Sequence, residues 1–113
     1  MDKPRHPPGG ASPLTPAVFH ILLALADGPL HGYAIMQAVE ESSGTGMGPG
    51  TIYGSLQRME EAGLVKEVVA AGDDRRRVFA LKPAGRAALQ AEAQRVARLA
   101  AIVRAKRLVP RET

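Results

Sequence analysis

The segment at residues 48–63, GPGTIYGSLQRMEEAG, constrains the fold more than any other part of the chain. A Gly-Pro pair opens it, and proline suits the first helical position, where its missing N–H costs no hydrogen bond. A glycine closes it, and glycine often ends a helix because it turns left-handed without a Cβ penalty. Ile52, Leu56 and Met59 fall at i, i+4 and i+7, which is the spacing of one buried helical stripe. The segment therefore predicts an amphipathic helix.

The face opposite this stripe carries little bulk at its N-terminal end. Its residues are Gly50, Thr51, Gly54, Gln57 and Arg58. The first turn of a helix presents unpaired N–H groups and the positive end of the helix dipole, so a lightly built start suits close approach to the anionic backbone of DNA. An ordinary amphipathic helix without a ligand is the alternative interpretation of the same pattern.

The residues before this segment predict two more helices. Residues 1–13 are polar and rich in proline and glycine, which is typical of a disordered tail. A Thr-Pro pair then opens a helix over residues 15–26, because threonine caps helices and proline suits the first turn. A second helix is expected over residues 31–43. Because a short glycine-rich link joins it to the segment at 48–63, the two have the layout of a helix-turn-helix.

After this segment the periodicity changes from helical to that of strands. Residues 64–70 are rich in valine and residues 76–81 alternate, with a Gly-Asp-Asp turn between them, so we expect a β-hairpin. Its tip carries three consecutive arginines, Arg75, Arg76 and Arg77. The chain is therefore expected to be mainly α-helical with one β-hairpin, and residues 14–82, called the head below, are expected to form its folded domain.

A long helix is expected from Pro83 to about Leu108, in a segment at 83–109 that precedes a short tail at 110–113. About 25 helical residues span roughly 37 Å, which is more than the core of a small head can cover. Apolar residues recur along it at heptad spacing, and the first helix is apolar almost all round. We therefore expect a homodimer in which this helix packs on its counterpart and on the partner's first helix. A helix folded back on its own head is the alternative. The predicted interface residues are Phe19, Leu23, Leu89, Val96, Leu99 and Val103.

The composition argues against several other classes of protein. Without cysteine the chain forms no disulfide or cysteine-based metal site, and three scattered histidines are too few for a metal sensor. No Ser/His/Asp set and no phosphate-binding loop points to an enzyme, so we expect no catalytic site and no cofactor. The longest apolar run, residues 21–26, is far shorter than the ~20 residues of a membrane helix, and no signal peptide is visible, which favours the cytoplasm.

Charge is distributed unevenly along the chain. Residues 1–70 carry a net charge of −3 and residues 71–113 a net charge of +7. Such asymmetry indicates an anionic partner for the second half, and double-stranded DNA fits it. A solvated helix face that happens to use arginine is the alternative for the C-terminal part.

Several short strings stand in a specific order and spacing. They are GPLHGY at 28–33, GPGTIY at 48–53, GLV at 63–65 and RRVFAL at 76–81, with Ile35, Leu56, Met59, Glu60, Gly85 and Arg86 between and after them. Over residues 14–90 this arrangement resembles the PadR family of winged-helix transcription regulators. Two positions depart from the family pattern, since Gly54 stands where proline is common and Val78-Phe79 stands where the wing usually has two tyrosines.

The resemblance implies a winged helix-turn-helix over residues 14–82 and a homodimeric, cytoplasmic, bacterial repressor that binds a palindromic operator. It implies that the third helix enters the major groove and that the hairpin, or wing, touches the DNA backbone or minor groove. It also implies control by a small hydrophobic effector bound between the long helices. A winged-helix module that binds other proteins and not DNA is the alternative.

On this hypothesis the DNA contacts come from the third helix and the wing. Thr51 contacts a phosphate or a thymine methyl, whereas Arg58 reads guanine or pairs with a glutamate on its own helix. The Tyr53 hydroxyl contacts a phosphate, with core packing as the alternative, and Arg77 is in part structural. The predicted DNA-binding residues are Gly50, Thr51, Tyr53, Gly54, Gln57, Arg58, Lys66, Arg75, Arg76 and Arg77.

Overall fold

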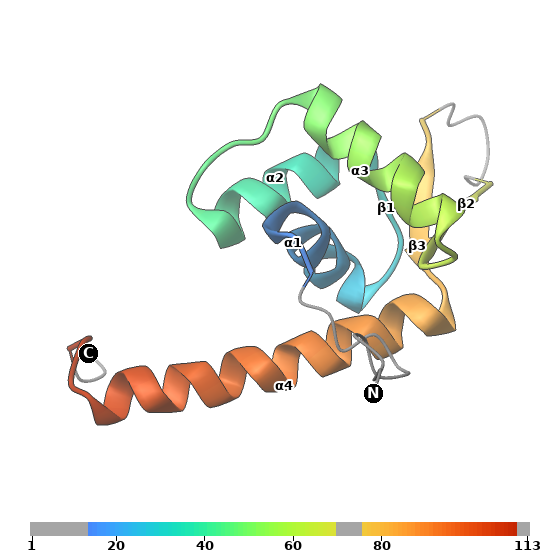
Figure 1. The fold of residues 1–113 in the computed structure, drawn as a ribbon. Coiled ribbons are helices and arrows are strands. Elements are labelled where there is room, and N and C mark those ends of the chain that lie inside the picture. The colour runs from blue at the N-terminus through green and yellow to red at the C-terminus, as the bar shows by residue number, and fades with distance from the viewer. Residues whose placement is uncertain (1–13, 70–75, 111–113) are drawn as a thin grey trace, which may run out of the picture.

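The computed structural model describes residues 14–69 and 76–110, and it arranges them as four α-helices and a small sheet (Figure 1). The elements in order are α1 (Pro16–Ala24), the short 3-10 helix η1 (Leu25–Asp27), β1 (Leu30–His31), α2 (Gly32–Ser43), α3 (Pro49–Glu61), β2 (Val65–Val68), β3 (Val78–Leu81) and α4 (Pro83–Ala105). The predicted order of three helices, a hairpin and a long helix is confirmed. The predicted tail at 1–13, the turn at 72–74 and the last residues, 111–113, lie outside the described residues.

The sheet contains one strand that the sequence pattern did not predict. It has three antiparallel strands in the order β1-β3-β2, and β1 places Leu30 opposite Phe79 and His31 opposite Val78. In the predicted hairpin, β2 pairs with β3 from Val65 opposite Leu81 to Val68 opposite Val78. A strand of two residues is too short to show alternation, so its position becomes visible only in the folded chain.

The core surrounds α1, which packs against α2, α3 and α4. This apolar helix is therefore central to the fold of the single chain. Ile21, Leu22 and Leu25 are buried. The predicted stripe of α3 is buried completely, and so is Phe79 of β3, which lies in the same core cluster.

Capping residues begin and end the head's helices where the sequence predicted. The Thr15 hydroxyl accepts a hydrogen bond of 3.3 Å from the Val18 N–H at the start of α1. α2 ends at Gly44 with a φ of 81°, and the chain leaves α3 through Gly63 with a φ of 80°. Both angles are left-handed, and glycine adopts them without steric cost.

The long helix α4 is packed against the head along its N-terminal part only. Its buried residues are Gly85, Leu89 and Glu92. A Cβ atom at Gly85 would overlap the Leu64 carbonyl oxygen, so this glycine lets α4 lie directly on the turn that follows α3. Figure 1 shows the C-terminal half of α4 projecting beyond the head. Among the described helices, none combines the length and the apolar character that a membrane span requires.

Candidate nucleic-acid interface

The first turn of α3 is open and lightly built. Gly48 caps it without a side-chain hydrogen bond, and Pro49, Gly50 and Thr51 are exposed. A Cβ atom built at Gly50 would have no heavy atom within 4 Å. The first N–H groups of a helix have no intrahelical partner, and here they belong to exposed residues, so an anionic backbone approaching the helix start meets only the small side chains of Pro49 and Thr51.

Arg58 lies about two turns further along the exposed face of α3, and its side chain extends back toward the helix start. Its Nη2 donates a 3.3 Å hydrogen bond to the hydroxyl of Ser55, a buried residue that the sequence analysis did not single out. Its Nη1 lies 3.7 Å from the position that a Cβ of Gly54 would occupy. Ser55 and the bare backbone at Gly54 thus place a positive charge beside the first turns of α3. Gln57 is exposed on the same helix.

Tyr53 lies at the edge of the core, between α3, the start of α2 and the wing. Its ring is 6.4 Å from that of Phe79 at an interplanar angle of 60°. A Cβ atom at Gly32 would overlap the Tyr53 hydroxyl, so the hydroxyl rests against the first residue of α2. This packing is the alternative role stated above for Tyr53, and a phosphate contact through its hydroxyl stays a prediction. Tyr33, in the first turn of α2, is exposed; it was not predicted as a site residue.

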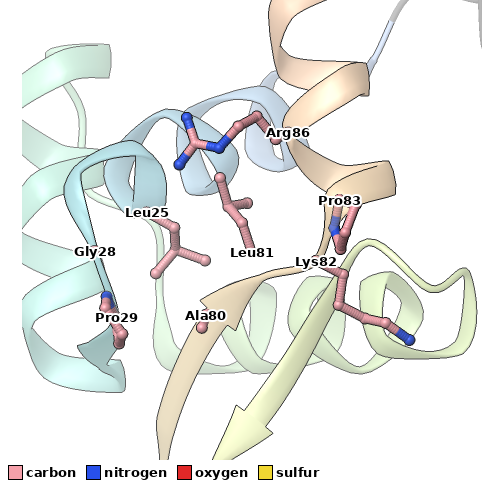
Figure 2. Close-up of a pocket in the computed structure, with 8 residues that line it drawn as sticks. All are labelled: Leu25, Gly28, Pro29, Ala80, Leu81, Lys82, Pro83 and Arg86. Carbon is pink, nitrogen blue, oxygen red and sulfur yellow. The ribbon is translucent and has the colours of Figure 1, made fainter.

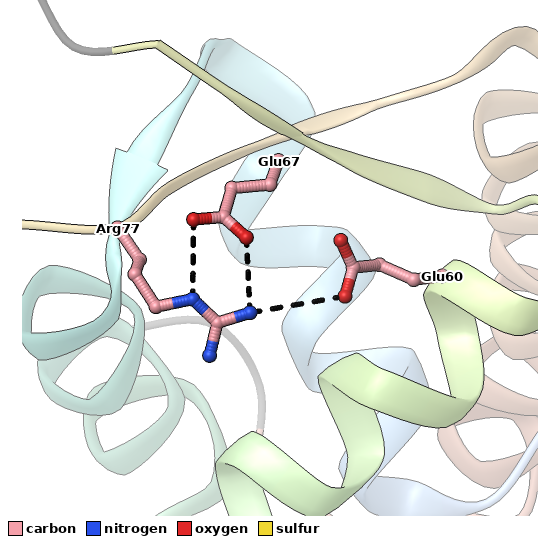
Figure 3. Close-up of polar contacts among 3 residues, drawn as sticks. All are labelled: Glu60, Glu67 and Arg77. Carbon is pink, nitrogen blue, oxygen red and sulfur yellow. Dashed lines mark hydrogen bonds and ion pairs between the residues drawn. The ribbon is translucent and has the colours of Figure 1, made fainter.

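Arg77 precedes β3 and has acidic partners on two other elements, β2 and α3 (Figure 3). Its Nε and Nη2 donate hydrogen bonds of 3.2 and 3.0 Å to the two carboxylate oxygens of Glu67 on β2. Nη2 also lies 3.9 Å from Oε1 of Glu60 on α3. The hydrogen bonds to Glu67 raise the pKa of the Arg77 guanidinium above its usual value. The sequence analysis named Arg77 as a DNA contact and in part structural, and the structure shows what that structural part consists of.

The other basic residues of the wing differ in their surroundings. Lys66 is exposed on β2, and Arg75 lies outside the described residues. Arg76 Nη1 lies 3.2 Å from Nε2 of His31, whose Nδ1 is 3.4 Å from the Ala34 N–H that it caps. A neutral imidazole has one donating and one accepting nitrogen, and both neighbours are donors. The cap of α2 and the contact with Arg76 therefore require different tautomers of His31.

The predicted interface residues fall into two groups. Leu89 is only 6% exposed and belongs to the core of its own chain, because the N-terminal part of α4 packs on α1. Phe19 is half-buried against the same core. In contrast, Val96 and Leu99 are 41% and 48% exposed, Val103 is half-buried and Leu23 on α1 is exposed. Ile102, which was not among the predicted interface residues, is 45% exposed.

A cavity of about 410 Å³ lies where the head joins α4 (Figure 2). It is lined by Leu25, Gly28, Pro29, Ala80, Leu81, Lys82, Pro83 and Arg86. Arg86 Nη2 donates a 3.0 Å hydrogen bond to the Ala26 carbonyl, which ties α4 to η1. The sequence does not predict this cavity, because its walls come from two stretches that lie far apart in the chain, residues 25–29 and 80–86.

Three helices, a small sheet that ends in a hairpin, and a long C-terminal helix define a winged helix-turn-helix protein with an appended helix. The model of the Transcriptional regulator PadR-like family matches residues 21–91. The chain belongs to this family, whose members are transcription regulators and not enzymes. The family resemblance and the fold class expected from the sequence are thereby confirmed.

Two relatives in sequence illustrate the match. The chain is 53% identical over 79 residues to an uncharacterised 37.1 kDa protein in transposon TN4556 of Streptomyces fradiae, and the match covers 70% of this chain and 22% of that protein. The chain thus spans about a fifth of that relative's length. It is 39% identical over 82 residues to the transcriptional regulator Rv3488 of Mycobacterium tuberculosis, covering 72% of this chain and 76% of Rv3488.

Solved structures share the fold. A PadR family transcription regulator from Clostridium difficile R20291 matches with a TM-score of 0.71 and 24% identity, covering 80% of this chain and 96% of that one. Bacillus subtilis PadR in complex with operator DNA matches with a TM-score of 0.56 and 23% identity, covering 65% of this chain and 44% of that one. At these identities the likeness concerns the fold alone.

Proposed function

We propose that the protein is a sequence-specific DNA-binding transcription regulator, a bacterial cytoplasmic repressor that binds a palindromic operator as a homodimer. The open first turn of α3 carries this proposal, because its back is anchored in the core while its front presents unpaired N–H groups to open space. A helix held in this way by a helix-turn-helix enters the major groove by its N-terminal residues. Family membership and the operator complex of Bacillus subtilis PadR support the same function.

In this proposal the exposed face of α3 contacts the DNA bases, and the wing binds the phosphates. Thr51 suits a phosphate or a thymine methyl, Gln57 suits adenine and Arg58 suits the O6/N7 edge of guanine. Gly50 and Gly54 keep the helix start narrow enough for close approach. Lys66 and Arg76 neutralise phosphates in this proposal, together with Arg75, which lies outside the described residues.

The homodimer is proposed from the exposed apolar side chains of α4. Val96, Leu99 and Ile102 lie beyond the part of α4 that the head covers, and a second copy of the chain offers the same apolar surface. One head makes few DNA contacts, whereas two linked heads raise the effective affinity through high local concentration. The two α3 helices would then lie about 34 Å apart, one turn of DNA.

Control by a small hydrophobic effector is part of this proposal. The space between the long helices of the dimer is one place for it, and the cavity of Figure 2 is a second. A ligand at the junction of the head and α4 would change the angle between them and thereby the spacing of the two heads. A compound that releases the wild-type protein from its operator but not the Ala80→Leu variant would favour the cavity, and equal release of both would favour the interface.

Binding-site selection from random duplexes, followed by titration of the selected sequence, tests the proposed function. We expect a palindrome whose half-sites are centred one helical turn apart, bound more tightly than competitor DNA. Gln57→Ala should relax the selected sequence, whereas Gln90→Ala, which removes an exposed glutamine on α4, should not. A wild-type protein that selects no sequence and ignores duplexes at low ionic strength would favour the protein-interaction module instead.

A further inference from the structure

The position of Arg77 joins the two parts of the protein that the proposed function brings to DNA. Glu60 belongs to α3, Glu67 belongs to β2, and the Arg77 guanidinium contacts both. Its central carbon lies 5.0 Å from the ring centre of Phe79 and 5.9 Å from that of Tyr53. The guanidinium thus lies between the helix and the wing, with Glu60 and Glu67 on one side of it (Figure 3).

These contacts occupy one edge of the guanidinium, the edge formed by Nε and Nη2. Nε and Nη2 are engaged in a paired hydrogen bond with one carboxylate, an arrangement that is stronger and more directional than a single contact. A phosphate that recruited the same edge of Arg77 would leave Glu60 and Glu67 without their cation beside an anionic backbone. This edge of Arg77 is therefore badly placed to bind a phosphate, although 51% of the side chain is exposed.

We propose that Arg77 is a positioning residue, which fixes the wing relative to α3 and neutralises the carboxylates of Glu60 and Glu67. This inference rests on the proposed DNA binding and deepens it. On this inference Arg77 does not bind a phosphate, and phosphate binding is left to Lys66, Arg75 and Arg76. Tight, specific binding then depends on a contact inside the protein. The contacts of Arg77 hold the wing in the position from which it reaches the DNA backbone while α3 lies in the major groove.

Arg77→Lys separates the two roles of Arg77. Lysine keeps the charge and binds phosphate as a point charge, but it cannot form the paired hydrogen bond with Glu67. We expect this variant to bind the selected operator about three- to tenfold more weakly, with an unchanged salt slope and an unchanged melting temperature. Lys66→Gln serves as the matched phosphate control, and it should reduce the salt slope by about one unit per protomer.

Glu67→Gln gives a second, opposite signature. It removes a negative charge near the DNA, so affinity for random duplexes should rise, while loss of the paired hydrogen bond lowers the ratio of operator to random-duplex affinity by about threefold. If Glu67 only restrained a phosphate-binding arginine, the same variant would raise affinity for both duplexes and leave the ratio unchanged. Hydrogen exchange without DNA should become faster in β2 and β3 and stay the same in α1 for both variants.

The outcomes distinguish this inference from the proposed function. If the wild-type protein binds its operator and Arg77→Lys has the same operator affinity and hydrogen exchange as the wild-type protein, the positioning role is overturned but the proposed function is not. A flatter salt slope for Arg77→Gln, of the size seen for Lys66→Gln, also overturns it and restores Arg77 as a phosphate ligand. If the wild-type protein binds no duplex, both proposals fail together.

Discussion

α3 and α4 are both amphipathic helices in sequence, but the chain covers their apolar faces very differently. Ile52, Leu56 and Met59 of α3 are completely buried by α1, α2 and the sheet. In α4, Leu89 is 6% exposed and Val96, one heptad later, is 41% exposed. The same spacing therefore marks a core position in one turn and an uncovered position two turns later. Periodicity in the sequence shows that a helix has an apolar face, but only the folded structure shows which part of that face the chain itself covers.

The largest effect is expected for Leu56→Ala in α3. Truncating a fully buried leucine removes its transfer free energy and leaves a cavity, which costs about 2–5 kcal/mol of unfolding free energy. Because this core is formed within a single chain, the loss should not depend on protein concentration. Urea unfolding at two concentrations measures it, with Leu108→Ala, which truncates an exposed leucine, as the control. A change below about 1 kcal/mol would show that α3 is less firmly packed than its burial indicates.

Leu99→Glu in the projecting half of α4 tests whether a second copy of the chain covers the apolar residues of that half. A charge in the proposed dimer interface should yield folded monomers, and loss of the linked second head should weaken operator binding about a hundredfold. Sedimentation and operator titration measure the two effects. Gln94→Glu adds the same charge at an exposed position of α4 and should leave the dimer intact. A wild-type protein that is monomeric at micromolar concentration would contradict the proposed interface.

Two glycines sharpen the comparison between the helices. Gly85→Ala in α4 would drive a Cβ into the Leu64 carbonyl oxygen, and we expect it to cost about 1–3 kcal/mol of unfolding free energy. Gly50→Ala in α3 has open space around its Cβ, so the same change should be neutral or stabilise the protein by up to about 1 kcal/mol. Thermal unfolding of both variants gives the comparison. Equal effects would mean that α4 is not held closely against the turn after α3.

The sequence predicted the helices well, because proline, threonine and glycine mark their ends locally. It also predicted that the face of α3 opposite the stripe is lightly built, which follows from Gly50 and Gly54. What it could not predict depends on residues far apart in the chain. The pairing of Arg77 with Glu60 and Glu67 requires α3 to lie beside the wing, and β1 exists only because β3 reaches it. Leu89 and Val96 occupy equivalent heptad positions in the sequence. Only the packing of the folded chain determines that the head covers Leu89 and leaves Val96 exposed.

Glu92 marks the point where the head stops covering α4, and the smallest effect is expected there. It is buried, and Arg95 donates hydrogen bonds of 3.3 and 2.8 Å to its two carboxylate oxygens. These hydrogen bonds hold the pKa of the Glu92 carboxyl below its usual value. A carboxyl with a lower pKa in the folded state stabilises that state above its unfolded pKa of about 4.3, and this contribution disappears as the pH falls through the folded pKa.

Glu92→Gln should therefore lower the unfolding free energy at neutral pH by less than about 1 kcal/mol, because Arg95 is partly exposed to solvent. The difference from the wild-type protein should shrink steadily as the pH falls through the lowered pKa of the Glu92 carboxyl and the carboxyl becomes protonated. Urea unfolding across this pH range measures it, with Glu41→Gln on the surface of α2 as the matched control. A difference that stays constant with pH would mean that packing of the Glu92 side chain, and not its charge, holds this turn of α4 against the head.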